Sequence, residues 1–335
     1  MDIPSLQKAL LNPKIYPDLP EKVELIETHI SLVFLTPAYV YKVKKPVNFG
    51  FLDFTSLDKR KYFCQQEVKL NRRLSPNLYL GVVEITSDGE WISFAGKGEV
   101  EEVAVKMKRI PEELLLDKLL ERGQVDREMM RTLSERLARF YASAETNDHI
   151  KSFGKPERIK QDADENFEQT EKYVGAVLSR PVYDEIQKRT NEFFKNREPL
   201  FHRRIDSGRI RDCHGDLRLE HIFWGKEIAI FDCIEFNERF RYTDVAADIA
   251  FLAMDLDYHK RSDLSDDLIQ SYIETSSDRE ALHLLDFYKC YRAYVRGKVE
   301  SFRLDDPHIP DAEKKGAVAR AKNYFELAYQ YALRF

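Results

Sequence analysis

The sequence is most informative between residues 213 and 232. It reads Cys-His-Gly-Asp-Leu-Arg-Leu-Glu-His over residues 213–221 and Ile-Ala-Ile-Phe-Asp over residues 228–232. Short apolar runs at 222–224 and 228–230 flank Gly225-Lys226-Glu227, a pattern typical of a β-hairpin with a three-residue loop. With the lysine at the centre of the turn, Asp232 falls opposite Glu220 and beside His221, and a slip of one residue would place it opposite His221.

The hairpin therefore predicts that Asp216, His221 and Asp232 share one site. An Asp in a loop after Gly, a second polar residue five positions later and an Asp at the end of a strand form the layout of phosphoryl-transfer sites, in which they act as base, metal ligand and metal ligand. A Gly-Asp turn and a strand-ending Asp are each common structural features. The prediction thus rests on their spacing together.

These residues resemble a known family. The segment His214-Gly215-Asp216, with position 221 and Asp232, is similar to the catalytic motif of the aminoglycoside phosphotransferase and choline kinase families, whose fold is that of protein kinases. The stretches 231–237 (FDCIEFN), 244–251 (DVAADIAF), 40–46 (VYKVKKP) and 49–54 (FGFLDF) further resemble a bacterial subgroup of aminoglycoside-phosphotransferase-like proteins. The likeness extends over about residues 25–300.

The resemblance implies roles for the residues that match it. Asp216 corresponds to the catalytic base and Asp232 to a metal ligand, while His214 and Asp248 support the catalytic loop. The expected cofactors are ATP or GTP with Mg²⁺, or Mn²⁺ in place of Mg²⁺. The resemblance also implies that a lysine in the small N-terminal lobe of the kinase fold is paired with a glutamate from the helix of the same lobe.

The sequence supports that glutamate independently. Within the helix expected over residues 56–74, Glu67 lies on one face with Phe63, Leu70 and Leu74. A carboxylate that points at an apolar core needs a cation nearby. Glu67 is therefore predicted to be buried and paired.

Two lysines compete for this pairing. Lys42 matches the family's placement and would also touch the α- and β-phosphates of the nucleotide. Lys44 lies on the same face of the strand expected over residues 39–44, because side chains two positions apart share a face. We prefer Lys42 and keep Lys44 as the alternative. For both, the structural alternative is a solvated charge on an edge strand.

The coarse layout is an α+β, bilobal protein-kinase-like fold. Strands are expected over residues 23–28, 31–35, 39–44, 79–86, 91–94 and 103–109, with one helix among them, and helices follow residue 110. The small strand-rich N-terminal lobe with one helix, residues 1–109, would bind the nucleotide. The large, mostly helical lobe, residues 110–335, would supply catalysis and acceptor binding.

Two positions depart from the family's pattern. The loop over residues 35–39 contains no Gly, although kinases usually bring flexible Gly backbone over the phosphates. His221 stands where the family places a metal-binding Asn. Because magnesium prefers oxygen donors, a histidine ligand predicts one metal or a preference for manganese. Alternatively, His221 hydrogen-bonds Asp216 or Asp232 and orients it.

Composition limits the class of protein. With 53 basic and 58 acidic residues, the net charge of −5 argues against a nucleic-acid-binding protein. The four cysteines form no C-x-x-C pair, the N-terminus lacks the pattern of a secretory signal, and no apolar run approaches the roughly 20 residues of a membrane span. We expect a cytoplasmic protein without a membrane partner, and the sequence gives no indication of a protein partner.

The predicted function is an ATP-dependent kinase that phosphorylates a hydroxyl of a small molecule. Lys289, Arg292, Arg296 and Arg303 form a basic stripe on the helix expected over residues 288–303, which is compatible with an anionic acceptor. A solvated face or ion pairs with Asp255 and Asp257 is the preferred interpretation. A nucleotide-binding pseudokinase with a regulatory role and a kinase that modifies a protein are the alternatives.

Overall fold

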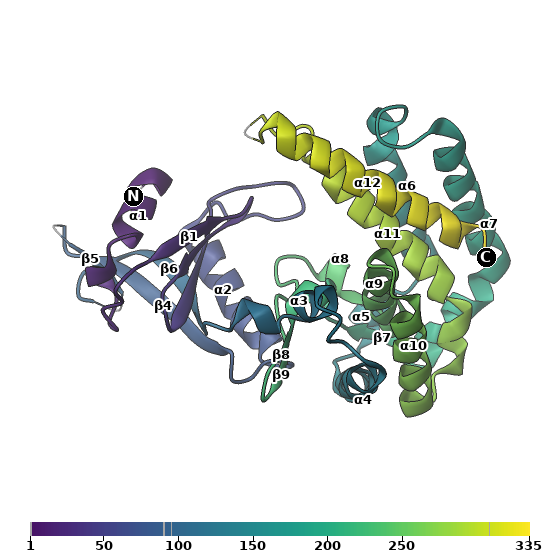
Figure 1. The fold of residues 1–335 in the computed structure, drawn as a ribbon, viewed down its shortest axis with the longest axis horizontal. Helices are drawn as coiled ribbons and strands as arrows, with labels where there is room; N and C mark the ends of the chain where they lie inside the picture. The colour runs from purple at the N-terminus through teal and green to yellow at the C-terminus, as the bar shows by residue number, and fades with distance from the viewer. Residues whose placement is uncertain (1, 90, 95, 308) are drawn as a thin grey trace. The chain divides into compact units, whose positions relative to one another are not determined.

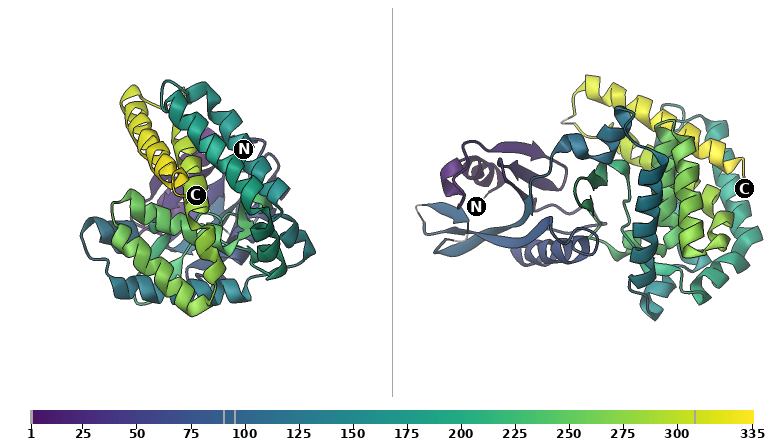
Figure 2. Two further views of the ribbon diagram at one scale, coloured as in Figure 1. Left: turned by 90° about the vertical axis from the view of Figure 1, so that its right-hand side faces the viewer. Right: turned by 60° about the horizontal axis from the view of Figure 1, so that its bottom comes forward.

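A computed structural model of the chain describes residues 2–89, 91–94, 96–307 and 309–335. The chain forms two compact units, which are visible in Figures 1 and 2. Unit 1 comprises Met1–Gly123 and Glu220–Glu238, and unit 2 comprises Gln124–Leu219 and Arg239–Phe335. The functional lobes 1–109 and 110–335 stay a prediction.

Unit 1 is built on an antiparallel sheet whose strand order is β1-β2-β3-β6-β4-β5. The strands are β1 (Glu24–Glu27), β2 (Ser31–Leu35), β3 (Tyr39–Lys44), β4 (Tyr79–Ser87), β5 (Ile92–Phe94) and β6 (Glu99–Lys108). They lie where runs of β-branched and aromatic residues predict them, and β6 begins four residues earlier than expected.

The two faces of this sheet carry different apolar clusters. Figure 1 shows the helices α1 and α2, which contribute to them, beside the sheet. On one face, Tyr41 and Val43 pack with Leu6 and Leu10 of α1 (Ile3–Leu10), a helix that was not predicted. On the other face, the cluster includes Cys64 and Val68 of α2 (Leu57–Asn71), together with Val103 and Val105 of β6. Because alternate side chains of a strand point to opposite faces, Lys42 and Lys44 of β3 face α2.

Helix α2 begins one residue after the predicted start and ends three residues before the predicted end. The Ser56 hydroxyl accepts the backbone N–H of Lys59 as an N-cap. The helix ends at Asn71, three residues before Leu74, because Arg73 and Leu74 donate to carbonyls three positions earlier and turn the chain. Its inner face carries Glu67.

The hairpin of unit 1 joins β8 (Ile222–Trp224) to β9 (Ile228–Ile230). Ile222 pairs with Ile230, so the turn is centred on Lys226, as predicted. A further backbone bond, from Phe231 N–H to the carbonyl of His221, extends the pairing toward Asp232. A bridge between Leu115 and Phe223 connects the hairpin to the start of α3 (Leu116–Glu121).

Unit 2 is mostly helical. Its helices are α4 (Arg127–Ser143), α5 (Asp148–Ser152), α6 (Pro156–Thr170), α7 (Arg180–Asp206), α9 (Val245–Tyr258), α10 (Ser262–Ser276), α11 (Leu285–Phe302) and α12 (Asp311–Ala332), with α8 (Glu238–Arg241) at the boundary with unit 1. Strands β7 (Ile210–Asp212) and β10 (Tyr242–Asp244) pair antiparallel. Helix α9 is apolar and buried around most of its circumference.

Across the described ranges, none of the helices has the length and apolar character needed to cross a membrane.

Candidate active site

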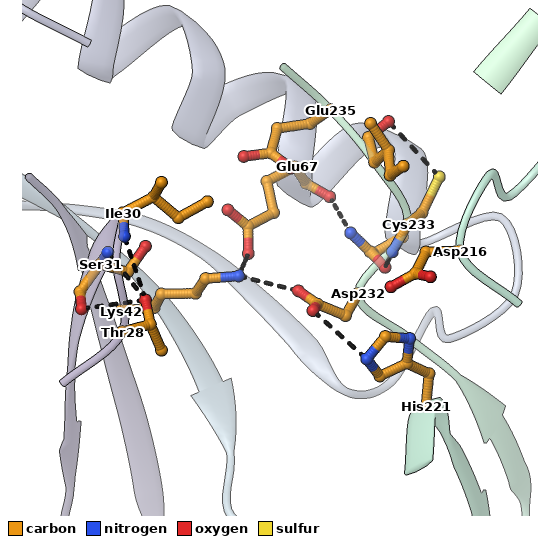
Figure 3. A network of polar contacts seen from close by, with 12 residues as sticks. Thr28, Ile30, Ser31, Lys42, Glu67, Asp216, His221, Asp232, Cys233 and Glu235 are labelled. Carbon is orange, nitrogen blue, oxygen red and sulfur yellow. Dashed lines mark hydrogen bonds and ion pairs between the residues drawn. The ribbon is translucent and has the colours of Figure 1, made fainter. Parts of the chain in front are cut away.

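Unit 1 holds a chain of alternating charges that connects Asp232 to Glu235, and Figure 3 shows its part from Asp232 through Lys42 to Glu67. Lys42 Nζ lies 2.8 Å from Asp232 Oδ1 and 3.0 Å from Glu67 Oε1. Lys44 Nζ lies 2.6 Å from the other oxygen of Glu67, Oε2, and also contacts Glu235 Oε1. Both candidate lysines therefore pair with Glu67, each through its own carboxylate oxygen.

Burial distinguishes the two ends of this chain. The side chains of Glu67 and Lys44 are fully buried, whereas those of Lys42 and Asp232 are 16% and 43% exposed. Only the end formed by Lys42 and Asp232 is open to a ligand of unit 1.

The contacts within this charge chain favour the ionised forms of Lys42 and Glu67, whereas burial raises the pKa of Glu235. Burial acts to lower the pKa of Lys42, but Asp232 and Glu67 outweigh it and raise that pKa well above its usual value. Burial acts to raise the pKa of Glu67, but the two lysines outweigh it and the pKa is lowered. At neutral pH the Lys42 amine is therefore cationic and the Glu67 carboxylate beside it is anionic.

Asp232 has an unusual backbone. Its φ of +61° is in the left-handed region, which costs energy for any residue with a Cβ, although Asp tolerates it better than most. The Asp232 N–H donates to the Tyr79 hydroxyl at 3.2 Å, and the next N–H, of Cys233, donates to Asn71 Oδ1 at 2.9 Å. Contacts from β4 and α2 thus hold a strained conformation that aims the carboxylate, as is common at functional sites.

His221 lies next to this carboxylate (Figure 3). Its Nε2 is 3.6 Å from Asp232 Oδ2 and 3.7 Å from Glu220 Oε1, which is too far for a direct hydrogen bond. The hairpin register thus brings His221 and Asp232 together as predicted. The two roles proposed for His221, metal ligand and orienting partner of a neighbouring Asp, stay predictions.

Asp216 belongs to unit 2, in the loop 214–219. Asp248 of α9 accepts the N–H of His214 at 3.0 Å through Oδ2 and the N–H of Gly215 at 2.9 Å through Oδ1. The Tyr141 hydroxyl donates to the same carboxylate at 3.0 Å. His214 and Asp248 are fully buried, so the start of the loop is fixed to the core of unit 2.

The structure adds three contacts to this loop that the sequence did not predict. Asp255 accepts the N–H of Leu219 at 2.9 Å, and Arg292 donates to the Gly215 carbonyl at 3.2 Å. Arg218 forms a two-pronged ion pair with Asp216, at 3.0 and 3.1 Å. One signal was present in the sequence: Asp255 follows Asp248 by about two helical turns in an otherwise apolar helix, which places both carboxylates on one face.

The comparison with protein families agrees with this geometry. The sequence model of the "Phosphotransferase enzyme family" matches residues 64–285. The chain belongs to this family. The predicted resemblance to aminoglycoside phosphotransferases is thereby confirmed.

Relatives of the phosphotransferase enzyme family resemble the chain in sequence. An uncharacterised protein of Mycobacterium tuberculosis is 34% identical over 310 residues, which cover 92% of this chain and 59% of that protein. An uncharacterised protein of Mycobacterium bovis gives the same values. The chain thus spans about three fifths of the length of these curated relatives.

Two solved structures share the fold of this phosphotransferase-family chain. A choline/ethanolamine kinase family protein from Mesorhizobium loti superposes with a TM-score of 0.51 at 12% identity, covering 98% of this chain and 99% of that chain. A putative aminoglycoside phosphotransferase from Ralstonia eutropha gives 0.54 at 15% identity, covering 93% and 92%. At such identities the likeness concerns the fold alone, and it confirms the predicted α+β, kinase-like class.

The donor set of this family member suits a metal that arrives with phosphate oxygens. Among the described residues, no group of three or more His, Cys, Asp and Glu side chains could hold a metal ion by itself. Magnesium commonly takes one or two carboxylates, with phosphates and water completing its octahedron. The half-exposed carboxylate of Asp232 fits that pattern.

The residues of the basic stripe on α11 form ion pairs and hydrogen bonds within unit 2. Lys289 Nζ lies 2.9 Å from Asp257 Oδ2 in a buried ion pair, and Arg292 is buried against the loop 214–219. Arg296 and Arg303 pair with Glu300 and Glu313. These contacts favour the ion-pair interpretation of the stripe over an anion-binding face.

Proposed function

We propose that the chain is an ATP-dependent O-phosphotransferase that moves the γ-phosphoryl group to a hydroxyl of a small-molecule acceptor. The observation that carries this proposal is the open end of the charge chain in unit 1, where the Lys42 amine and the Asp232 carboxylate are held by fully buried Glu67. In a phosphotransferase-family chain, this pair matches the needs of a metal-bound polyphosphate.

Each residue then has a chemical task. Lys42 contacts the α- and β-phosphates, and Asp232 would hold magnesium, which would offset the negative charge of the phosphates. Asp216 accepts the proton of the acceptor hydroxyl while the hydroxyl oxygen forms a bond to the γ-phosphorus. At the same time the bond between that phosphorus and the departing nucleoside diphosphate breaks. ATP and GTP share these phosphate contacts, so the titration described below decides which of the two nucleotides the chain prefers.

A nucleotide-binding pseudokinase is the second candidate. The observation in its favour is the turn between β2 and β3, where Thr36 and Tyr39 exchange backbone and hydroxyl hydrogen bonds at 2.8 to 3.1 Å. Such a closed turn without Gly offers less free backbone N–H for clamping phosphates than a Gly-rich loop does.

Calorimetric titration with ATP and GTP, with and without magnesium, tests the proposal, followed by turnover across a library of hydroxyl metabolites. We expect magnesium-dependent binding and transfer to at least one acceptor. Asp232→Ala should remove the magnesium-dependent part of the affinity, whereas Asp206→Ala, at an exposed position at the end of α7, should not. Binding without transfer to any acceptor supports the pseudokinase, and absence of nucleotide binding contradicts both functions.

A further inference from the structure

The charge chain continues beyond the residues that the proposed reaction uses. Lys44 is held between two carboxylates, Glu67 on α2 and Glu235 in the segment that follows β9. Glu235 is only three residues after Asp232, the proposed metal ligand. A second ion pair thus attaches the segment 232–235 to β3, next to the first pair between Lys42 and Asp232.

Lys44 is enclosed where a nucleotide phosphate would not reach it. Its side chain is fully buried, that of Glu235 is 5% exposed, and the ring of Phe54 lies 4.9 Å from Nζ. Removing both charges from water is costly, and a buried ion pair is often no more stabilising than apolar side chains of the same volume. The pair therefore calls for an explanation other than stability, and geometry supplies one.

The segment 232–235 is fixed at successive points along its length. The backbone N–H groups of Asp232 and Cys233 donate to Tyr79 and Asn71, and the Glu235 side chain is held by Lys44. Because Asp232 adopts a left-handed conformation, its surroundings must hold it there. Of these contacts, the one through Lys44 is charged on both sides, and it shares Glu67 with Lys42.

We propose that Lys44 and Glu235 are positioning residues that set the orientation of the Asp232 carboxylate and of Lys42 toward a metal–nucleotide complex. Lys44 acts through Glu67 and Glu235 and does not touch the phosphates. This inference rests on the proposed function of the same site. It assigns the two lysines of β3 to different tasks, contact for Lys42 and alignment for Lys44.

The test compares ATP affinity in magnesium with ATP affinity in EDTA, because their ratio measures what the metal adds. The variants are Lys44→Met, Glu235→Gln and the double variant Lys44→Met/Glu235→Leu, which removes both charges of that pair and leaves Glu67 paired with Lys42 alone. Lys61→Met is the matched control, since Lys61 also forms a Lys–Glu pair between α2 and the sheet, with Glu84 at 2.9 Å, but at the surface. Melting temperatures are recorded for all proteins.

We expect each single variant and the double variant to lower the ratio by about tenfold, the usual scale for partners that orient a metal ligand. The double variant should melt above Lys44→Met, because it leaves no unpaired charge at position 235, and still have the low ratio. A ratio equal to the parent's in the double variant overturns the inference, because the pair is then structural only. If a single variant does not fold, the double variant gives the answer.

A parent protein that binds ATP equally well with and without magnesium contradicts the proposed function, and the inference fails with it. A parent with a clear magnesium effect and variants that keep it contradicts the inference alone. The parent protein therefore tests the proposed function, and the variants test the inference about Lys44 and Glu235.

Discussion

Asp248 and Asp255 lie about two helical turns apart on α9 and accept backbone N–H groups from opposite ends of the loop 214–219. Asp248 takes the first two N–H groups of the loop and Asp255 takes the last. One rigid, buried helix therefore sets the shape of the loop that carries Asp216. Burial raises the pKa of Asp255, and the nearby Arg218 offsets part of that effect.

Asp255→Ala should lower phosphoryl transfer by about tenfold while the affinity for Mg-ATP stays at the parent value, because it frees the end of the loop and leaves unit 1 intact. Asp255→Asn keeps an acceptor oxygen and should recover most of the rate. Transfer rates and calorimetric affinities of the three proteins check this. Equal losses for Ala and Asn would contradict the hydrogen-bond explanation.

Asp216→Ala should lower transfer by at least about 10²-fold, the usual contribution of a positioned general base, and leave nucleotide affinity nearly unchanged. The measurement is single-turnover transfer to the acceptor found in the library, with calorimetry as the control for binding. Turnover equal to that of the parent would remove Asp216 from the mechanism.

Glu67→Ala should lower the free energy of unfolding by roughly 3 kcal/mol, the lower end of the cost of breaking a buried ion pair. The lower end applies because Lys42 keeps Asp232 and Lys44 keeps Glu235 as partners. Urea denaturation checks the value, with Glu84→Ala at the surface as the control. A denaturation midpoint equal to the parent's would show that Glu67 is not needed to hold the lysines.

His221→Asn should raise activity with magnesium relative to activity with manganese, because an amide oxygen suits magnesium better than an imidazole nitrogen does. The experiment measures transfer with each metal for parent and variant. If the ratio of the two activities is the same in both proteins, His221 is not a metal ligand, and the alternative that it orients Asp232 is favoured.

Lys298 gives a prediction for alkaline pH. Burial lowers its pKa to about 8, although it donates to Asn166 and Gln169. Between pH 8 and the unfolded-chain value of about 10.4, the unfolded chain binds more protons, so this lysine adds stability as the pH rises. The free energy of unfolding of the parent minus that of Lys298→Met should therefore increase over this range. For exposed Lys195→Met the difference should stay flat.

Local sequence patterns determined much of the fold. The six strands and α2 follow from side-chain periodicity and capping, and the register of the β8–β9 hairpin follows from its three-residue loop. These features depend on residues close together in the chain, so they can be read without the tertiary structure. Helix α1 had local signals too, since Asp2 caps it by accepting the N–H of Ser5 and Pro4 stands in its first turn, but its short length hid them.

The sequence also predicted that His221 lies near Asp232 and that Glu67 is buried and paired, as the structure shows within unit 1, whereas the role of Asp216 stays a prediction. Only the tertiary structure separated Lys42 from Lys44. Both lie on the same face of β3, so periodicity treats them alike, whereas burial and the positions of Asp232 and Glu235 place one at the open end and enclose the other. The contact of Asp255 with Leu219 likewise joins residues distant in the chain, and such contacts depend on how helices pack.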